Sequence, residues 1–236
     1  LSKEIVRGLC TYGNAILDSR LYTKALFQAA IKRGSSLITG EVINLQKKGD
    51  RITGVTLSTE NLVCDSVVLA NGPWSSIGSD WLDTSIPVKP LKGEILRMAP
   101  PNGGIPSHDF TSTEASLFSR ADGLLWIGAT EEWKGFDDQP SISARQSLLD
   151  GAIRILPALS ESVVVKQTAC LRPVTPDWLP ILGKVPNWHN AYLATGAGKK
   201  GILMSTGMGK AIAEIITTGN TELPIDSLSP ERFLTH

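Results

Sequence analysis

The chain has 236 residues, of which 42% are hydrophobic, and its 23 basic and 23 acidic side chains cancel. This composition supports a buried core and argues against intrinsic disorder, while the lack of a basic excess argues against a nucleic-acid binder. No stretch approaches the roughly 18 apolar residues of a membrane-spanning helix, and no signal-peptide pattern opens the chain.

The three cysteines are too far apart in sequence for a disulfide framework or a zinc-binding pattern. We therefore expect buried or free thiols in a reducing compartment, the cytoplasm, with an organelle as the alternative. The cysteines are Cys10, Cys64 and Cys170. The histidines are scattered in the same way, so no metal site is expected. They are His108, His189 and His236.

The first predicted element is a helix that follows a loop. Residues 1–18 predict a loop with one or two short extended pieces. A helix is predicted from about Leu21 to Lys32, because apolar residues recur there at helical spacing. Asp18 or Ser19 would cap its start, and the next glycine, at position 34, suits its end.

Extended segments come next. Residues 41–48 and 51–58 predict a β-hairpin around Lys48-Gly49-Asp50. Residues 62–70 predict two short strands. Because Val67-Val68-Leu69-Ala70 is continuously apolar, we expect the second of these strands to be covered on both faces.

The pattern changes after Gly72-Pro73-Trp74. Residues 87–98 predict a long strand, and residues 102–113 predict a loop that is rich in glycine, proline and polar side chains. Residues 117–128 predict a second hairpin around Ala121-Asp122-Gly123. The middle of the chain therefore reads as mainly antiparallel.

The last third returns to mixed elements. Ser141 or Ser143 would cap a helix that stops before Pro157. Residues 163–168 predict a β-branched strand. Residues 191–195 predict another strand, followed by a glycine-rich turn and a helix to about residue 218.

This order of elements fits neither a simple doubly wound parallel sheet nor a β-sandwich. A mixed α/β chain with two interleaved parts would explain it. One part would resemble a nucleotide-binding fold, and the other would be an antiparallel substrate-binding sheet.

Gly196-Ala197-Gly198-Lys199-Lys200-Gly201 matches G-x-G-x-x-G between a strand and a helix, and three interpretations are open. A dinucleotide fingerprint is one, although too few residues follow for the rest of that fold. A purely structural strand–turn–helix is the second. The third, which we favour, is a turn facing a flavin, because a helix N-terminus offers free N–H groups and partial positive charge to a reduced flavin. Small residues in the helix would permit close approach to the sheet or cofactor. They are Ser205, Thr206, Gly207 and Gly209.

Four segments, in this order, resemble the family of flavin-dependent amine oxidases that includes glycine oxidase, sarcosine oxidase and D-amino-acid oxidase. The similar segments are residues 67–75, 87–94, 127–137 and 171–183, the last followed by the glycine-rich turn. Together they extend over nearly the whole chain. Each would be weak alone, and their shared order makes the resemblance specific.

The resemblance implies the C-terminal part of an FAD/NAD(P)-binding-like fold with an inserted antiparallel substrate domain. Residues 1–82 and 171–236 would belong to the FAD-binding domain, and residues 83–170 would form the substrate domain. Because the chain begins with Leu1 rather than Met, we expect the native start to be absent. The family's own G-x-G-x-x-G would lie in that missing N-terminal FAD-binding segment.

The resemblance also implies a reaction. The enzyme would oxidise the C–N bond of glycine, sarcosine or a D-amino acid by hydride transfer to FAD, giving an imine and then an oxo acid. The alternative is a non-catalytic assembly or scaffold protein, or a truncated remnant, of the same fold. An upstream coding sequence with a strand–G-x-G-x-x-G–helix would favour the enzyme. A homo-oligomer is left open.

Two catalytic candidates follow from the resemblance. Arg172 would hold the substrate carboxylate with two parallel hydrogen bonds, and the alternative is a structural ion pair. Lys200 would contact the carboxylate or the flavin, and the alternative is a solvated turn lysine. The residues expected to contact FAD are Val42, Ala70, Asn71, Gly72, Trp74, Gly93, Gly196, Gly198, Lys199, Gly201 and Ile202.

Other positions depart from the family pattern. Monomeric sarcosine oxidases attach FAD through a cysteine near the place of Cys170, but the glycine oxidase branch does not, so we expect a buried, inert thiol. Ser116 and Phe118 occupy the stretch where glycine oxidases often place a tyrosine. Trp126 lies where sarcosine oxidases keep a lysine linked to oxygen activation, so oxidase and dehydrogenase both remain open.

Overall fold

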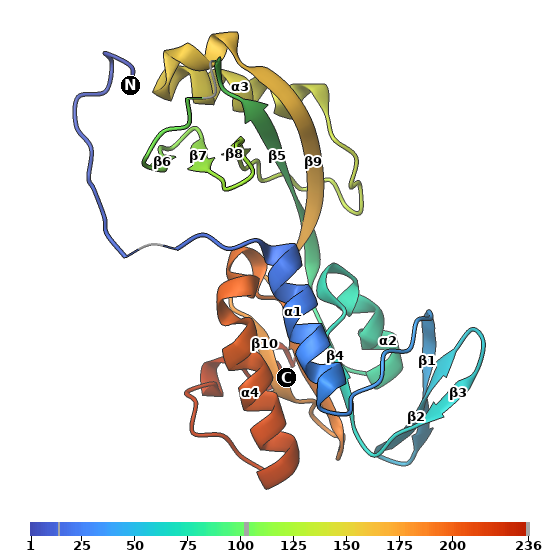
Figure 1. The fold of residues 1–236 in the computed structure, drawn as a ribbon. Helices are drawn as coiled ribbons and strands as arrows, with labels where there is room; N and C mark the ends of the chain where they lie inside the picture. Colours follow the sequence, from blue (N-terminus) through green and yellow to red (C-terminus); the bar gives the residue numbers. More distant parts are fainter. Residues whose placement is uncertain (14, 102–103, 235–236) are drawn as a thin grey trace. The chain divides into compact units, whose positions relative to one another are not determined.

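The computed structural model describes residues 1–13, 15–101 and 104–234, and they form two compact units (Figure 1). Unit 1 comprises Leu1–Leu9 and Lys89–Val174, and unit 2 comprises Cys10–Val88 and Thr175–His236. Unit 1 is therefore almost entirely an insertion into the sequence of unit 2. The assignment of the two parts to FAD and to substrate stays a prediction.

Unit 2 contains a three-stranded sheet with the order β10–β11–β4. Its strands are β10 (Ile181–Lys184), β11 (Ala191–Thr195) and β4 (Val67–Leu69). β10 pairs antiparallel with β11, and β11 pairs parallel with β4. The sequence predicts β11 and β4 but not β10, which overlaps the end of the Pro-rich motif, residues 171–183.

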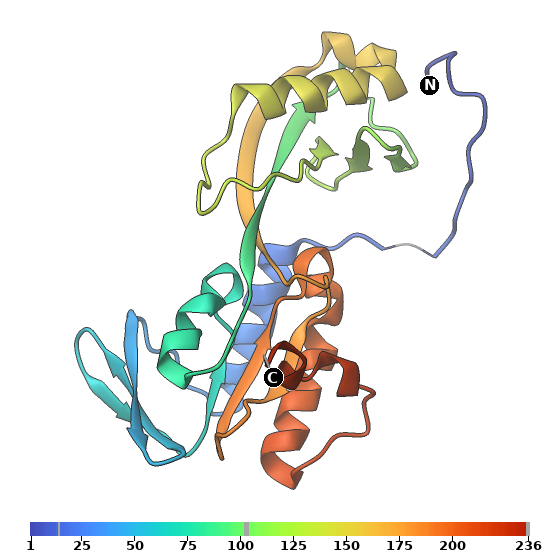
Figure 2. The same cartoon turned by 180° about the vertical axis from the view of Figure 1, so that it is seen from behind.

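One face of this sheet is covered by α4 (Gly201–Thr218), as both views show (Figures 1 and 2). Met208 and Ile212 of the helix pack with Leu182 and Tyr192 of the sheet. The opposite face carries Leu193, which belongs to a second core cluster. That cluster also contains Leu45, Ile52, Leu69, Leu82, Ile86, Val88, Ile181, Val185, Trp188 and Ala191.

The expectation that β4 is covered on both faces is wrong for this chain. Leu69 is buried, but Val68 is 37% exposed and Ala70 is also exposed. β4 is the edge strand of its sheet, and Val68 lies opposite Tyr192 in the direction of α4, which covers β10 and β11. A continuously apolar strand therefore keeps one side uncovered here.

The predicted hairpin forms a separate sheet in unit 2. β1 (Val42–Lys48) and β2 (Arg51–Leu57) pair antiparallel, and β3 (Asn61–Val63) adds to β2. Gly49 has φ +61° at the turn, a conformation that glycine adopts readily. The hairpin prediction is confirmed.

A single buried amide ties this hairpin to the sheet that contains β4. Asn190 Oδ1 accepts from the Ile52 N–H at 2.9 Å, and Asn190 Nδ2 donates to the Ile52 and Asp65 carbonyls at 2.7 and 2.6 Å. Asn190 lies one residue before β11. It therefore satisfies three backbone groups where β2, β4 and β11 converge.

The helix α1 (Ser19–Lys32) confirms the first predicted element. Asp18 caps it, because its Oδ1 accepts from the Leu21 N–H at 2.9 Å. α1 runs beside α4 in both views, and the Tyr22 and Ser205 hydroxyls lie 3.4 Å apart (Figures 1 and 2). None of its residues is buried.

Unit 1 is a five-stranded antiparallel sheet with the order β6–β7–β8–β5–β9. Its strands are β5 (Lys89–Ala99), β6 (Phe110–Thr111), β7 (Ser116–Ser119), β8 (Leu125–Gly128) and β9 (Val163–Val174). The helix α3 (Ile142–Ile155) covers one face, over Leu96, Met98 and Leu117 (Figure 1). Ser141 caps α3 by accepting from the Ala144 N–H at 3.2 Å.

Two elements of unit 1 differ from the sequence-based expectation. β9 continues six residues beyond the predicted end at residue 168 and so includes Cys170 and Arg172, because its pairing with β5 extends to Val174. β6 forms within the predicted loop of residues 102–113, of which residues 102 and 103 lie outside the described residues. The second hairpin, β7–β8, is confirmed.

The remaining elements are short. They are α2 (Gly78–Leu82) and the 3₁₀ segments Gly72–Ile77, Pro157–Glu161, Gly198–Lys200, Asp226–Leu228 and Pro230–Phe233. Within the described parts of the chain, no helix combines the length and the apolar character needed to cross a membrane.

Replacing Asn190 with alanine should destabilise the protein by about 2–4 kcal/mol, because the Ile52 N–H and two carbonyls lose their buried partner. Urea unfolding of both proteins would measure the loss. Asn61→Ala, at an exposed position of β3, is the matched control and should change stability little. Equal stability of the wild type and Asn190→Ala would contradict the anchoring role.

Candidate functional site

Two turns of unit 2 meet at one edge of its sheet. β4 and β11 are parallel, so the turns that leave their carboxyl ends lie side by side, where open α/β sheets usually bind ligands. The Ser75 and Thr195 hydroxyls lie 2.6 Å apart. Ser75 Oγ donates to the Gly72 carbonyl at 2.7 Å. The predicted residues Asn71, Gly72 and Trp74 are thereby brought next to the glycine-rich turn.

The glycine-rich turn needs its first glycine for two reasons. Gly196 has φ +74°, and a β-carbon there would lie 2.6 Å from Thr175 Cγ2. Thr175 is held in turn, because its hydroxyl donates to the Leu179 carbonyl at 2.7 Å. The turn therefore packs directly on the segment 175–179 of the Pro-rich motif.

The helix α4 begins at the end of this turn without a side-chain cap from the described residues. Lys200 is its N-cap residue and has an exposed side chain. Lys199 Nζ lies 5.7 Å from the centre of the Trp178 ring. Uncapped N–H groups and two lysines make this end of unit 2 positive, which suits an anionic ligand.

The small residues of α4 do not bring the helix close to the sheet. A β-carbon added at Gly207 or Gly209 would meet no described atom within 4 Å. The expectation of a close helix–sheet approach is therefore wrong at these positions. Close approach of a bound cofactor stays a prediction.

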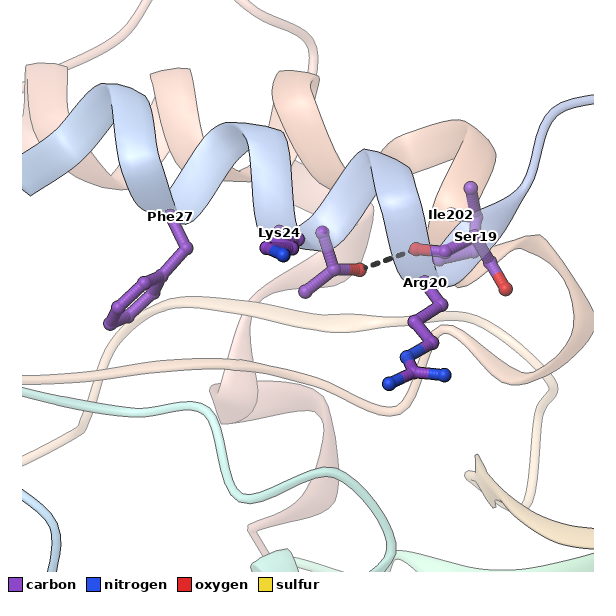
Figure 3. Close-up of a pocket in the computed structure, with 6 residues that line it drawn as sticks. Ser19, Arg20, Lys24, Phe27 and Ile202 are labelled. Carbon is purple, nitrogen blue, oxygen red and sulfur yellow. Dashed lines mark hydrogen bonds between the residues drawn. The ribbon is translucent and has the colours of Figure 1, made fainter.

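An open hollow of about 500 Å³ lies beside the start of α4 (Figure 3). It is lined by Ser19, Arg20, Thr23, Lys24, Phe27 and Ile202. Arg20 and Phe27 extend from the same side of α1 in the close-up. Ile202 is the predicted FAD contact that reaches this hollow, and it is 42% exposed.

The predicted FAD contacts Val42 and Gly93 do not belong to this edge. Val42 begins β1 in the other sheet of unit 2, and Gly93 lies in β5 of unit 1. His236 lies outside the described residues, and within the described ones no group of side chains could hold a metal ion.

The carboxylate-binding candidate Arg172 lies near the end of β9 in unit 1. Its Nη1 donates to the Thr130 carbonyl at 3.2 Å. In residues 1–13, 15–101 and 104–234, no carboxylate lies within ion-pair distance of Arg172, so the structural ion-pair alternative is not supported. Its side chain is partly exposed and keeps further N–H donors for a ligand.

Cys170 lies two residues before Arg172 on the same face of β9. Its thiol is free and exposed, so the expectation of a buried cysteine is wrong. The reason is positional, because β9 is an edge strand and Cys170 lies opposite Gly93, which offers no side chain to cover it.

A buried ionic network lies on the other face of β5 and was not predicted from the sequence. The Lys92 and Glu94 side chains are 2% and 0% exposed, and Lys92 Nζ lies 3.3 Å from Glu94 Oε1 and 2.8 Å from Asp137 Oδ2. Glu94 accepts from the Ser141 N–H and hydroxyl at 2.9 and 2.8 Å and from Gln167 Nε2 at 2.7 Å. The signal in the sequence was the presence of two opposite charges, Lys92 and Glu94, at alternate positions of a predicted strand, which places them on one face.

These contacts determine the charge of the network. Burial raises the pKa of Glu94, but the hydrogen bonds from Ser141, Gln167 and Lys92 outweigh it, so the pKa of Glu94 lies below its ordinary value. The hydrogen bond to Asp137 raises the pKa of Lys92. Both groups are therefore ionised at neutral pH, and they fix the start of α3 to the centre of β5.

Two arginines stack on Trp126, the position where sarcosine oxidases keep a lysine. Arg97 Cζ lies 4.1 Å and Arg120 Cζ 4.6 Å from the centre of the ring. Trp126 Nε1 donates to Asp122 Oδ2 at 3.2 Å. The indole is thus held by cation–π contacts in unit 1.

Arg232 of unit 2 was also missed. Its Nε donates to Asp177 Oδ2 at 2.8 Å, and its Nη2 donates to the Leu179 and Pro180 carbonyls at 2.9 Å each. The hydrogen bond from Arg232 lowers the pKa of Asp177 to about 2. These contacts of Arg232 hold the last 3₁₀ segment, Pro230–Phe233, against the Pro-rich motif.

Comparison with known proteins gives one family. The family model described as FAD dependent oxidoreductase matches residues 1–215. A D-amino acid dehydrogenase of Paramagnetospirillum magneticum is 30% identical over 99% of this chain and 56% of its own length. A glycine oxidase of Pseudomonas putida is 31% identical over 82% of this chain and 52% of its own length. The chain thus spans a little over half the length of these relatives.

Solved structures agree with this fold. An L-proline dehydrogenase from P. horikoshii superposes with a TM-score of 0.84 at 26% identity, over 90% of this chain and 59% of its own. A glycine oxidase from Geobacillus kaustophilus superposes with a TM-score of 0.83 at 25% identity, over 90% of this chain and 57% of its own. The mixed α/β fold with an antiparallel sheet is therefore confirmed.

The Asp177–Arg232 pair predicts an acid-dependent contribution to stability. Because the pKa of Asp177 is lowered from 3.8 to about 2, the contribution is complete above pH 4 and is lost as the pH falls toward 2. Asp177→Asn should cost about 1 kcal/mol near pH 7, since the pair is partly exposed and screened by solvent. The difference from wild type in urea unfolding should shrink near pH 2. The exposed Asp138→Asn is the control, and a difference that does not change with pH would contradict the assignment.

Proposed function

This chain belongs to the FAD-dependent oxidoreductase family, and we propose that it forms the C-terminal part of an enzyme that oxidises the C–N bond of a small amino acid. Relatives named glycine oxidase and D-amino acid dehydrogenase support a substrate with an amine and an α-carboxylate. Glycine, sarcosine and D-amino acids are the candidates.

The observation that carries this proposal is that Arg172 has few partners within the described residues. A guanidinium that makes one hydrogen bond to a carbonyl and no described ion pair keeps charge and donors for an incoming anion. A substrate carboxylate would neutralise this charge and accept hydrogen bonds from these donors. In unit 2, Lys200 is the second proposed cation, and its exposed position at the start of α4 leaves it accessible to the carboxylate or the flavin.

The turns at the carboxyl ends of β4 and β11 fit the flavin. Gly72 and Gly196 have φ +55° and +74°, so both turns expose backbone without side chains. The uncapped start of α4 presents N–H groups that suit a reduced, negatively charged ring. The proposed contacts at this edge are Ala70, Asn71, Gly72, Trp74, Gly196, Gly198, Lys199, Gly201 and Ile202.

When bound, the flavin supplies a hydride acceptor for the α-carbon hydrogen of the amino acid, and the resulting imine is hydrolysed to an oxo acid and ammonia or an amine. The contribution of the chain is to orient the substrate. Arg172 holds the carboxylate and therefore fixes which hydrogen faces the cofactor.

We further propose that unit 2 receives the FAD-binding segment that carries the family's own G-x-G-x-x-G. Its apolar surface supports this assignment, because Leu21 and Leu203 are 64% and 79% exposed and Val68 on edge strand β4 is 37% exposed. An edge strand with an uncovered apolar side is the surface to which a further strand and helix can add.

The full-length protein should bleach its flavin absorbance anaerobically with at least one member of a panel of glycine, sarcosine, D-amino acids and proline. Arg172→Leu should weaken binding of that amino acid about 30- to 1000-fold, because a charge-assisted bidentate pair of roughly 2–4 kcal/mol is lost. The corresponding amine without a carboxylate should be affected far less. Steady-state kinetics on both substrates would measure this difference.

Lys166→Leu is the matched control, because Lys166 is an exposed cation on the same face of β9, six pairs further along the ladder. It should leave both substrates unchanged. A panel that leaves a loaded flavin oxidised would overturn the amine-oxidation proposal. Equal losses on both substrates, or loss of FAD from Arg172→Leu, would make Arg172 structural.

Leu203→Asp tests the proposed packing surface. In the 236-residue chain it should reduce binding of a hydrophobic dye, because the side chain is 79% exposed. In the full-length protein it should instead lower stability, by about 1.5–3 kcal/mol, through lost burial. Ile142→Asp, at an 88% exposed position of α3, is the control for a general surface effect. The same effect of Leu203→Asp in both proteins would argue against a packed segment.

A further inference from the structure

The guanidinium of Arg172 lies directly over the backbone of Gly93. A β-carbon added to Gly93 would lie 2.0 Å from Nη1, 2.2 Å from Nη2 and 2.3 Å from Cζ of Arg172. Non-bonded heavy atoms do not approach so closely, so any side chain at this position must displace the guanidinium. The three nearest atoms all belong to Arg172.

The backbone conformation does not explain the glycine. Gly93 does not have a positive φ, and it lies in the regular part of β5. A glycine inside a strand costs stability because it has no side chain to pack and loses more entropy on folding. The close approach of Arg172 is therefore the physical reason for a glycine here.

The register of β5 and β9 produces this approach. Arg172 pairs with Leu91, and Gly93 pairs with Cys170, so Arg172 and Gly93 are diagonal neighbours on one face. Diagonal positions lie about 7–8 Å apart, within reach of an arginine that lies along the sheet. The Arg172 side chain crosses to β5 and rests on the glycine.

A hydrogen bond is the second contact that holds the guanidinium. Arg172 Nη1 donates to the Thr130 carbonyl at 3.2 Å. Thr130 is fixed to the residue after Gly93, because the Glu94 N–H donates to Thr130 Oγ1 at 2.9 Å and the Thr130 N–H donates to the Glu94 carbonyl at 3.2 Å. The guanidinium therefore contacts Gly93 directly and the Thr130 carbonyl, and Thr130 is held by Glu94.

The residues on both sides of Gly93 make this support rigid. Lys92 and Glu94 point to the opposite face, where the buried ionic network joins them to Asp137 and Ser141. Their backbones also pair with Glu132 and Thr130. The strand beneath Arg172 is therefore held from its other face.

We propose that Gly93 is a positioning residue for Arg172 and thereby sets the preference for substrates with a carboxylate. Gly93 leaves the space that the Nη1–Nη2 end of the guanidinium occupies, and the Thr130 carbonyl accepts a hydrogen bond from Nη1. Within the described residues, the Nε–Nη2 edge makes no hydrogen bond or ion pair, and it is the edge that receives the two carboxylate oxygens. This inference rests on the proposed role of Arg172 in carboxylate binding.

A double-mutant cycle in the full-length flavoprotein tests it, with Gly93→Ala, Arg172→Ala and both together. Gly93→Ala alone should raise KM for the amino acid on the order of 10- to 100-fold, because a small displacement of Arg172 spoils the bidentate geometry. KM for the amine without a carboxylate should not change. In the Arg172→Ala background, Gly93→Ala should have no further effect on the amino acid.

Thermal unfolding gives a second readout that does not depend on activity. Gly93→Ala should raise Tm in the Arg172→Ala background, where the added methyl group has room and the strand loses a destabilising glycine, and this gain should be absent with Arg172 present, because the guanidinium must move. Gly8→Ala is the control, since a β-carbon there meets nothing within 4 Å. It should change neither Tm nor KM.

The outcomes separate this inference from the proposed function. Additive effects of the two substitutions on both KM and Tm would overturn the positioning role of Gly93. A change of carboxylate preference in Arg172→Ala without one in Gly93→Ala would do the same. Coupled Tm values with no change of carboxylate preference in Arg172→Ala would instead overturn the proposed function of Arg172.

Discussion

The pairing of β5 with β9 is the constraint on which unit 1 depends. It runs from Lys89↔Val174 to Ala99↔Val163, and it fixes which face each side chain takes. Because alternate residues point to opposite faces, Gly93 and Arg172 share one face while Lys92 and Glu94 lie on the other. A slip of one residue in β5 would turn Lys92 and Glu94 away from Asp137 and Ser141, their partners on the other face.

In unit 2, strand pairing likewise determines which residues meet. Its parallel pair β4–β11 brings two sequence-distant turns together, and two hydroxyl groups at 2.6 Å join them. Neither turn has bulky side chains at its glycines, so the edge exposes backbone. Unit 1 thus holds a cation on a strand and unit 2 exposes a backbone edge, and each arrangement follows from strand pairing within its own unit.

Local patterns in the sequence predict much of this fold, because they need only neighbouring residues. The capping carboxylate of Asp18, the glycine turn at Gly49 and the β-branched run of β9 are examples. The missed features depend on residues far apart in the chain. These contacts arise only after strands and loops have come together. They are the Lys92–Asp137 and Arg232–Asp177 ion pairs and the contact of Arg172 with Gly93. The exposed Cys170 was missed for the same reason, since its exposure depends on the residue opposite.

The insertion of unit 1 into unit 2 has a consequence for synthesis on the ribosome. Ser75 and Thr195 are 120 positions apart in the chain. β4 therefore leaves the ribosome with its parallel partner β11 still to be made, while all of unit 1 can pair within itself in between. Non-local parallel pairing forms slowly, and unpaired apolar strands aggregate. The apolar Val67–Leu69 therefore stays without its partner strand until Ala191–Thr195 has been made.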